Sequence, residues 1–207
     1  MNEKSIESVL IIVAHPDDET LWAGGTILIH PEWRCFVISL CRGSDKDRAF
    51  RFHNALKVLN AQGVIADLND GPTQDPLNVS ELDKTILELL PTQSFDLMIT
   101  HNPKGEYTRH LRHEEVSKAV IQLWNANKIA ARELWTFAYE DSGKAYFPRP
   151  MKTVDLHFQL PEKILEKKYQ LITETYGFEE SSWEAKTCPK TEAFFRYQKL
   201  APFEITS

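Results

Sequence analysis

The first group of residues suited to chemistry is the segment HPDDE at residues 15–19, which directly follows a short apolar run. Imidazole nitrogens and carboxylate oxygens are both good zinc ligands. Pro16 stiffens the turn and keeps the residue before it extended, so His15 and Asp18 can converge while Asp17 points elsewhere. A helix cap needs only one acid, and three crowded acids repel one another unless a cation or a proton compensates. The segment therefore indicates a metal site.

A second group lies in the segment THNPKGEYTRHLRHEEV, residues 100–116. His110 and His113 are three residues apart at the entry to a predicted helix, so they share one helix face. Taken alone, two such histidines are better explained as surface or capping residues. Together with the first segment they offer two histidines and one carboxylate, a set that leaves a coordination position open for water, as catalytic zinc sites require.

Such a set supports hydrolysis of an amide. A bound zinc ion lowers the pKa of its water to about 7, and a neighbouring carboxylate such as Asp17 can complete the deprotonation. A protonated His110 can offset the charge of the tetrahedral intermediate and then give the departing nitrogen its proton. The ligand types also suit another divalent ion such as Fe²⁺. The sequence therefore predicts Zn²⁺ and leaves Fe²⁺ as the second choice.

The elements that must position these residues alternate between strands and helices. Five apolar runs predict strands buried on both faces: Val9–Val13, Cys35–Leu40, Val64–Leu68, Phe95–Ile99 and Leu134–Ala138. Four segments with apolar residues every three or four positions predict helices: Leu21–His30, Asp45–Leu59, Ser80–Leu90 and Leu111–Asn125. The alternation predicts a Rossmann-like α/β fold, a mostly parallel sheet with helices on both faces. Ligands of such sheets bind at the carboxyl ends of the strands, where both segments lie.

A single α/β domain is expected over residues 1–207, which suffice for one substantial core. Beyond the first 140 residues the pattern changes to a short alternating run, Val154–Leu160, and a helical pattern over Pro161–Tyr176. No low-complexity stretch separates this part from the rest. We therefore expect residues 141–207 to be a C-terminal elaboration packed on a core of about residues 1–140.

Composition narrows the partners and the compartment. The chain has 24 Lys and Arg against 30 Asp and Glu, a formal net charge of −6, which argues against nucleic acid or an anionic membrane surface. Its N-terminal apolar run is too short for a signal peptide or a membrane span, and three cysteines without a CxxC pair give no disulfide framework. We expect a cytoplasmic protein with a small-molecule partner. The aromatic residues Trp183, Phe194 and Phe195 either close the core, which we favour, or form an interface in a homo-oligomer.

The two motifs, AHPDDE from residue 14 and HLRH from residue 110, resemble those of the LmbE/PIG-L family of metal-dependent de-N-acetylases. The resemblance covers about the first 140 residues. It implies a zinc-dependent hydrolase that removes an N-acetyl group from an amino-sugar conjugate, in most of the family an N-acetylglucosaminyl compound. By the same resemblance His15, Asp18 and His113 would hold the metal, Asp17 would be the general base, and His110 would stabilise the oxyanion or protonate the leaving amine.

The resemblance also points to residues at the substrate. Arg48 resembles the arginine that opens the family's RxxE helix, although Arg51 stands where the acid is expected. Asp70 resembles the acid of the family's Asp-Gly turn at the mouth of the site. Arg48 is equally well read as a solvated charge on a helix. Glu106 and His101 either orient a ligand histidine or steer the substrate; we assign Glu106, with Arg48 and Asp70, to substrate binding.

Two other classes of protein share some of these features. Non-haem iron oxygenases also use two histidines and a carboxylate, but usually on an all-β barrel, whereas this chain alternates strand and helix. A nucleotide-binding module needs a glycine signature such as GxGxxG after its first strand, and this sequence has none there. The alternatives left open are a metal-binding Rossmann-like protein without deacetylase activity and a hydrolase of a different N-acyl substrate.

Overall fold

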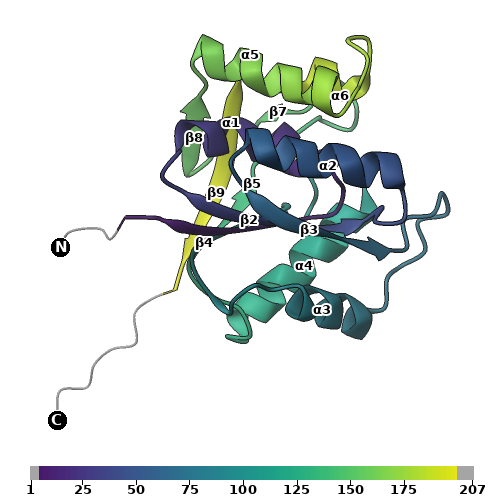
Figure 1. Cartoon of the computed structure of the whole chain (residues 1–207), viewed down its shortest axis with the longest axis vertical. Coiled ribbons are helices and arrows are strands. Elements are labelled where there is room, and N and C mark those ends of the chain that lie inside the picture. Colours follow the sequence, from purple (N-terminus) through teal and green to yellow (C-terminus); the bar gives the residue numbers. More distant parts are fainter. Residues whose placement is uncertain (1–4, 200–207) are drawn as a thin grey trace.

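Seven strands form one sheet between two layers of helices in the computed structural model, which describes residues 5–199 (Figure 1). The strand order across the sheet is β3-β2-β1-β4-β5-β9-β8. The strands of this sheet are β1 (Ser8–Val13), β2 (Arg34–Cys41), β3 (Gln62–Leu68), β4 (Ser94–Thr100), β5 (Ala130–Phe137), β8 (Leu156–Gln159) and β9 (Thr191–Gln198). Two further short strands, β6 (Tyr139–Glu140) and β7 (Arg149–Pro150), pair with each other.

The first five strands are parallel, as the continuous apolar runs predict. β1 pairs with β2 and β4, β2 pairs with β3, and β4 pairs with β5, all in parallel register. β9 is antiparallel to both β5 and β8. Every residue of Val9–Val13 is fully buried, which is typical of a central strand covered on both faces. The predicted mostly parallel α/β sheet with helices on both faces is therefore confirmed.

The helices follow the predicted periodicity and divide between the two faces. Four of them are α1 (Asp18–Ile29), α2 (Lys46–Val58), α3 (Val79–Glu88) and α4 (Leu111–Asn125). α3 and α4 lie on one face of the sheet, and α1 and α2 lie on the other (Figure 1). α1 begins three residues earlier than predicted, so Asp18 and Glu19 form its first turn. None of the helices within residues 5–199 is long and apolar enough to cross a membrane.

The strand order reverses beside β1, and this topology creates the crevice for a site. From β1 the chain moves outward through β2 to β3 and then returns to β4 on the other side of β1. The loops that follow β1 and β4 therefore leave the same edge of the sheet in opposite directions. His15 comes two residues after β1, and His101 comes directly after β4. Both motifs lie at this switch point.

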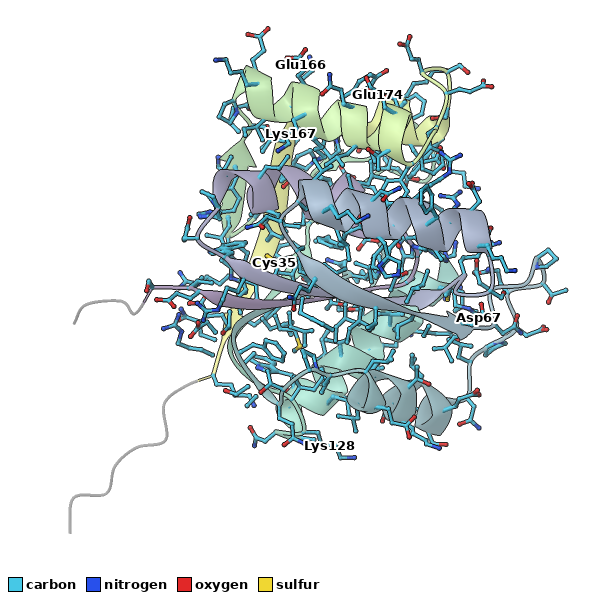
Figure 2. All side chains as sticks on the ribbon, in the orientation of Figure 1. Cys35, Asp67, Lys128, Glu166, Lys167 and Glu174 are labelled. Atoms are coloured by element: carbon cyan, nitrogen blue, oxygen red, sulfur yellow. The ribbon has the colours of Figure 1, made fainter. Side chains whose placement is uncertain are left out.

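The C-terminal part adds two strands and three helical segments to the same architecture. The alternating run contains β8, and the helical pattern contains α5 (Glu162–Gln170) followed by a π-helical turn, η1 (Leu171–Thr175). A short helix, α6 (Trp183–Thr187), then leads to β9. α5 and α6 lie on the same side of the sheet as α1 and α2, above them in the view of Figure 1, and the side chains of Glu166 and Glu174 point away from the sheet (Figure 2). The sequence did not predict β9; in it, Phe194 is buried in the core and Phe195 is half-buried.

A buried ion pair between α5 and β9 also anchors the C-terminal part to α1. Lys168 Nζ lies 2.7 Å from Glu192 Oε1, and neither side chain reaches solvent. The Glu192 carboxylate also accepts hydrogen bonds from the backbone N–H groups of Gly25 (2.8 Å) and Thr26 (2.6 Å). Because α1 carries Asp18 in its first turn, the last third of the chain helps to fix the helix on which the site begins.

Replacing Gly25 with Ala is expected to destabilise the fold by about 1–3 kcal/mol, the usual cost of an overpacked contact. An added Cβ would lie 2.3 and 2.5 Å from the two Cδ atoms of Leu160 and 2.9 Å from Glu192 Oε1. Gly24→Ala is the matched control, because the nearest atom would be 3.4 Å away and alanine favours a helix. Urea unfolding measures both. Equal stability of the two variants would contradict this packing.

Candidate functional site

Two histidines and one carboxylate converge at the switch point. His15 Nδ1 lies 3.2 Å from Asp18 Oδ2 and 3.3 Å from His113 Nε2. The third side of the triangle, from His113 Nε2 to Asp18 Oδ2, measures 3.5 Å. Ligands held about 2.0–2.1 Å from one tetrahedral zinc ion are about 3.3–3.4 Å apart. These three atoms therefore have the spacing of ligands that share one small ion.

Charge around Asp18 also favours a cation. Burial alone would raise the pKa of Asp18, but the histidines around it, with His15 Nδ1 at 3.2 Å, hold it well below its usual range. Burial would lower the pKa of His15, yet hydrogen bonds to Asp18 and Asp70 and their charges raise it to about 10. The cluster thus holds a proton between buried carboxylates. A divalent ion would supply the same positive charge by displacing that proton.

Glu106 lies behind His113 and does not face the cavity. Its Oε2 lies 2.6 Å from His113 Nδ1 and 3.1 Å from His101 Nδ1, and its Oε1 accepts the Asn102 N–H at 2.8 Å. Burial would raise the pKa of Glu106, but the two histidines lower it to about 2. A carboxylate that accepts the Nδ1–H of His113 leaves Nε2 unprotonated and able to bind a metal ion. The expectation that Glu106 contacts the substrate is wrong, because both of its oxygens are buried and engaged.

His101 packs behind His113 and bonds to the end of the strand that leads to His15. Its Nε2 accepts the backbone N–H of Ala14 at 2.9 Å, and its Nδ1 faces Glu106. Asp18, His101 and His113 do lie close enough together to suggest a metal-binding group. With both ring nitrogens already engaged, however, His101 has no lone pair left for an ion. Its ring instead stacks on that of His113, with centroids 3.9 Å apart.

Asp17 has a strained backbone that turns it into the cavity beside His15 and Asp18. Its φ is 118°, a conformation that costs a residue other than glycine about 1–3 kcal/mol. Glu19 Oε2 accepts its N–H at 3.1 Å, and Arg48 donates to its Oδ2 at 3.1 Å. Burial and the charge of Asp18 raise the pKa of Asp17 well above its usual range, against the opposing charge of Arg48. A raised pKa makes a carboxylate a better proton acceptor.

Glu19 holds this turn from inside the core. It is fully buried, and its Oε1 accepts hydrogen bonds from Thr20 Oγ1 (2.6 Å) and from the Tyr176 hydroxyl (2.5 Å). Burial raises its pKa. The sequence offered no sign that Tyr176, more than 150 residues away, reaches this carboxylate. Glu19 thus positions the backbone of Asp17 and does not line the cavity.

His110 lies across the cavity from the carboxylates, at the start of α4. Its ring centroid is 4.6 Å from those of His15 and His113, and, among the residues that the structure describes, none hydrogen-bonds to its Nδ1. Burial and the charges of His113 and His15 lower its pKa to about 4. The imidazole is therefore neutral at neutral pH in the metal-free chain, contrary to the expectation of a protonated His110.

The loop after β3 brings Asp70 to the same cavity. Asp70 Oδ1 lies 3.4 Å from His15 Nε2, and Arg42 Nε donates to Asp70 Oδ2 at 2.9 Å. The ends of this loop are held by Arg112, which is fully buried and donates to the carbonyls of Asn69 (2.7 Å) and Asp75 (2.6 Å). Nothing in the sequence pointed to this role of Arg112, since its partners lie about 40 residues away along the chain.

Arg48 and Arg51 have different surroundings on α2. Arg48 lines the cavity, pairs with Asp17 and lies over the ring of Phe178, 4.8 Å from its centroid. Arg51 bonds to Asp47 at 2.6 Å and donates to the carbonyl of Thr175 at 3.5 Å. The arginine found in place of the family's acid therefore ties α2 to the C-terminal part and does not reach the cavity.

These residues surround a cavity of about 270 Å³. One part of its wall is charged: Arg42, Asp45, Arg48 and Asp70. Another part is aromatic and consists of Tyr107 and Trp183, whose ring centroids are 4.7 Å apart in an edge-to-face arrangement. Trp183 comes from α6, so the C-terminal part supplies wall as well as support. The sequence analysis assigned Trp183 to core closure and did not place it at the site.

Comparison with known proteins adds a family and a fold. Residues 10–124 match the PIG-L family model, described as GlcNAc-PI de-N-acetylase. An uncharacterized protein of Acanthamoeba polyphaga mimivirus is 27% identical over 179 residues, which cover 79% of this chain and 76% of that protein.

Several solved structures share the fold at low sequence identity. The N,N'-diacetylchitobiose deacetylase of Pyrococcus horikoshii superposes with a TM-score of 0.70 and 17% identity, covering 97% of this chain and 88% of that one. The 4-carboxy-2-hydroxymuconate hydratase GalB of Pseudomonas putida gives 0.66 and 16%, covering 95% and 98%. A zinc-inhibited form of a teicoplanin deacetylase gives 0.66 and 14%, covering 93% and 98%. This fold therefore occurs in deacetylases and also in a hydratase.

Proposed function

The chain belongs to the PIG-L family of GlcNAc-PI de-N-acetylases, as its two motifs predicted, and we propose that it is a metal-dependent hydrolase that removes an N-acetyl group from an amino-sugar conjugate. The observation that carries this proposal is the triangle of His15 Nδ1, Asp18 Oδ2 and His113 Nε2, with sides of 3.2–3.5 Å. The strained, raised-pKa Asp17 on the same cavity supplies the base that such a hydrolase needs.

We assign the metal to His15, Asp18 and His113. Two nitrogens and a carboxylate oxygen favour Zn²⁺, with Fe²⁺ as the second choice. When bound, the ion would polarise the amide carbonyl and make a water acidic enough to lose its proton near pH 7. Glu106 would orient His113 from behind through Nδ1 at 2.6 Å, and Asp70, at the cavity wall, would orient His15 through Nε2 at 3.4 Å.

The protein's own groups would move the protons. Asp17 takes one from the attacking water as the new C–O bond forms. A neutral His110 still carries one N–H, which can donate a hydrogen bond to the oxyanion. When the C–N bond breaks, the proton held by Asp17 returns to the leaving nitrogen, directly or through His110. The products are a carboxylate and an amine, which takes up a further proton at neutral pH.

The charged wall suits a hydroxylated substrate. Arg42, Arg48 and Asp70 present donors and acceptors to the cavity, and a sugar ring carries hydroxyls that pair with both kinds of group. Arg48 is the candidate to contact substrate next to Asp17. The structural similarity to a deacetylase of N,N'-diacetylchitobiose supports an N-acetylated sugar as the small-molecule partner.

Two other functions fit parts of these observations. The hydratase of the same fold shows that the scaffold also serves addition of water to a substrate other than an amide. A metal-binding protein without hydrolase activity would keep the three ligands but has no need for a strained Asp17, which argues against it. A hydrolase of a different N-acyl substrate would use the same residues on another acyl group.

Incubation of the metal-depleted protein with N,N'-diacetylchitobiose tests the proposal. With added Zn²⁺ or Fe²⁺ we expect acetate and free amine in equal amounts, and with excess chelator we expect neither. Both ions are included because a teicoplanin deacetylase of this fold has a zinc-inhibited form. Acetate release that a chelator leaves unchanged would refute the metal dependence. Absence of release from this and other N-acetylglucosaminyl conjugates with either ion would refute the function.

A further inference from the structure

A second cavity, of about 560 Å³, adjoins the site. Tyr107 and Trp183 line both cavities, so the two spaces adjoin at this pair of rings. On its far side the second cavity is bounded by Tyr146 and Phe147, from the loop between β6 and β7. We call the space between these four aromatic residues the aromatic cleft. Its volume is within the usual range of about 300–1,000 Å³ for ligand pockets.

Two of the charged side chains that line the aromatic cleft are paired within the protein. The Asp141 carboxylate accepts the Thr108 N–H at 2.8 Å and the Thr108 hydroxyl at 2.7 Å. Arg109 makes two bonds to Glu114, at 2.5 and 2.8 Å. The remaining cation, Lys144, is exposed and can keep its ammonium in water. Beside these groups the cleft offers a ligand the apolar surface of its four rings.

Tyr146 and Phe147 present that surface at the outer wall. The Tyr146 hydroxyl bonds to Glu140 at 2.5 Å, and Arg149 covers its ring at 3.7 Å, so its polar end is turned away and its ring is held in place. Phe147 lines the same cavity and is 46% exposed, so its ring is accessible to a ligand there.

The two ends of an amide would leave the site in different directions. The charged wall, through Arg42, Asp45 and Asp70, continues into a separate polar cavity of about 360 Å³. The aromatic wall continues into the aromatic cleft. A sugar on the amine side of the amide matches the charged wall, which leaves the acyl side facing Tyr107 and Trp183.

We propose that the aromatic cleft binds the acyl group, so that this chain prefers amino sugars whose N-acyl group is longer than acetyl. The inference rests on the proposed function and deepens it. The reaction is unchanged in its balance: water adds its oxygen to the carbonyl carbon, the C–N bond breaks, and the fatty carboxylate and the amine leave. Phe147 and Trp183 lie outside residues 10–124, the part that matches the family model, so the preference would belong to this chain's own C-terminal part.

A series of N-acylglucosamines with acetyl, butanoyl, hexanoyl and octanoyl groups tests the proposal on the metal-loaded protein. Each methylene that is fully buried contributes about fourfold in affinity. Because the cleft is partly open, we expect kcat/KM to rise at least about tenfold from acetyl to octanoyl. Binding is measured separately by tryptophan fluorescence, where octanoyl should again exceed acetyl.

Phe147→Ser is expected to lower the octanoyl-to-acetyl ratio of kcat/KM about fivefold or more, because it removes one wall of the cleft. Phe50→Ser is the matched control: Phe50 is 66% exposed on α2, lines neither cavity, and should leave the ratio unchanged. A fall in kcat/KM with acyl length would overturn the proposal. So would a gain from an octyl glycoside of N-acetylglucosamine that Phe147→Ser abolishes, since the cleft would then serve the amine side.

The binding measurement separates the two levels of inference. If no N-acyl substrate is hydrolysed with any metal but octanoylglucosamine still binds more tightly than the acetyl compound in a manner that depends on Phe147, the proposed function fails and the acyl site stands. If acetyl substrates are hydrolysed while octanoyl compounds bind no better, the function stands and the acyl site fails.

Discussion

Replacing Asp17 with Asn is expected to lower kcat by about a hundredfold to ten-thousandfold, the usual value of general-base assistance. Asparagine keeps the size of the side chain but cannot take a proton from water. The metal content should persist, because Asp17 lies outside the triangle of His15, Asp18 and His113. KM should change little, since the interaction that is lost belongs to the transition state. Steady-state kinetics and elemental analysis on the same preparations measure the two effects.

Asp18→Asn is the matched control for that experiment. It changes the neighbouring acid in the same way, but it weakens a metal ligand. Its primary effect should therefore be a fall in metal occupancy, and the loss of activity should follow from the missing metal. If Asp17→Asn empties the site while Asp18→Asn keeps its metal, the two acids have exchanged roles. A fully active Asp17→Asn would require another base, and the oxygens of Glu19 and Glu106 are already engaged by buried partners.

The sequence was enough to predict the sheet and the place of the site. A strand covered on both faces is a nearly continuous apolar run, so the segment SVLIIV predicts β1 without knowledge of the neighbouring strands. The first motif directly follows β1, and the second lies between the end of β4 and the first turn of α4. The reversal of strand order at these two strands is the usual place for a ligand. Local pattern and global topology therefore agree in this part of the chain.

The parts that the sequence could not predict depend on contacts between distant residues. β9 reads TEAFFRYQ, in which a glutamate is buried because Lys168 and two backbone N–H groups of α1 satisfy it. No local rule predicts a buried acid in a strand, and so the strand was missed. Arg112 was overlooked for the same reason, since it bonds to backbone carbonyls of a loop some 40 residues away.

The role of Glu106 was misassigned because the sequence around it fits two roles, contact with the substrate and orientation of a ligand histidine. An acid in a polar loop near a histidine motif can face either the substrate or the back of a ligand. The choice depends on how the loop folds, and here Asn102 and Asp141 hold it so that Glu106 points inward: the Asn102 N–H bonds to Glu106, and Asp141 holds Thr108. Both of its oxygens are buried by the tertiary structure, and the spacing of residues along the sequence does not predict that burial.

Replacing His113 with Ala is expected to abolish stoichiometric metal binding. The substitution removes one of the three atoms of the triangle and leaves Glu106 without the imidazole that it orients at 2.6 Å. Loss of an orienting partner typically weakens metal binding about 10–100-fold, and loss of a ligand should cost more. Glu106→Gln therefore serves as the graded comparison, with weakened but measurable binding. Elemental analysis and competition with a chelating dye give occupancy and affinity.

The His113→Ala measurement has to be separated from loss of folding, because His113 is buried and its ring stacks on His101. The thermal midpoint of each variant is therefore compared with that of the metal-free wild type, and only a variant that folds as the metal-free protein does is scored. Metal should raise the midpoint of the wild type and leave that of His113→Ala unchanged, since an ion stabilises only the state that binds it. Full metal content in a folded His113→Ala would move the ligand role to His110, which shares a possible metal group with His15. His101 would remain excluded by its bond to the Ala14 N–H.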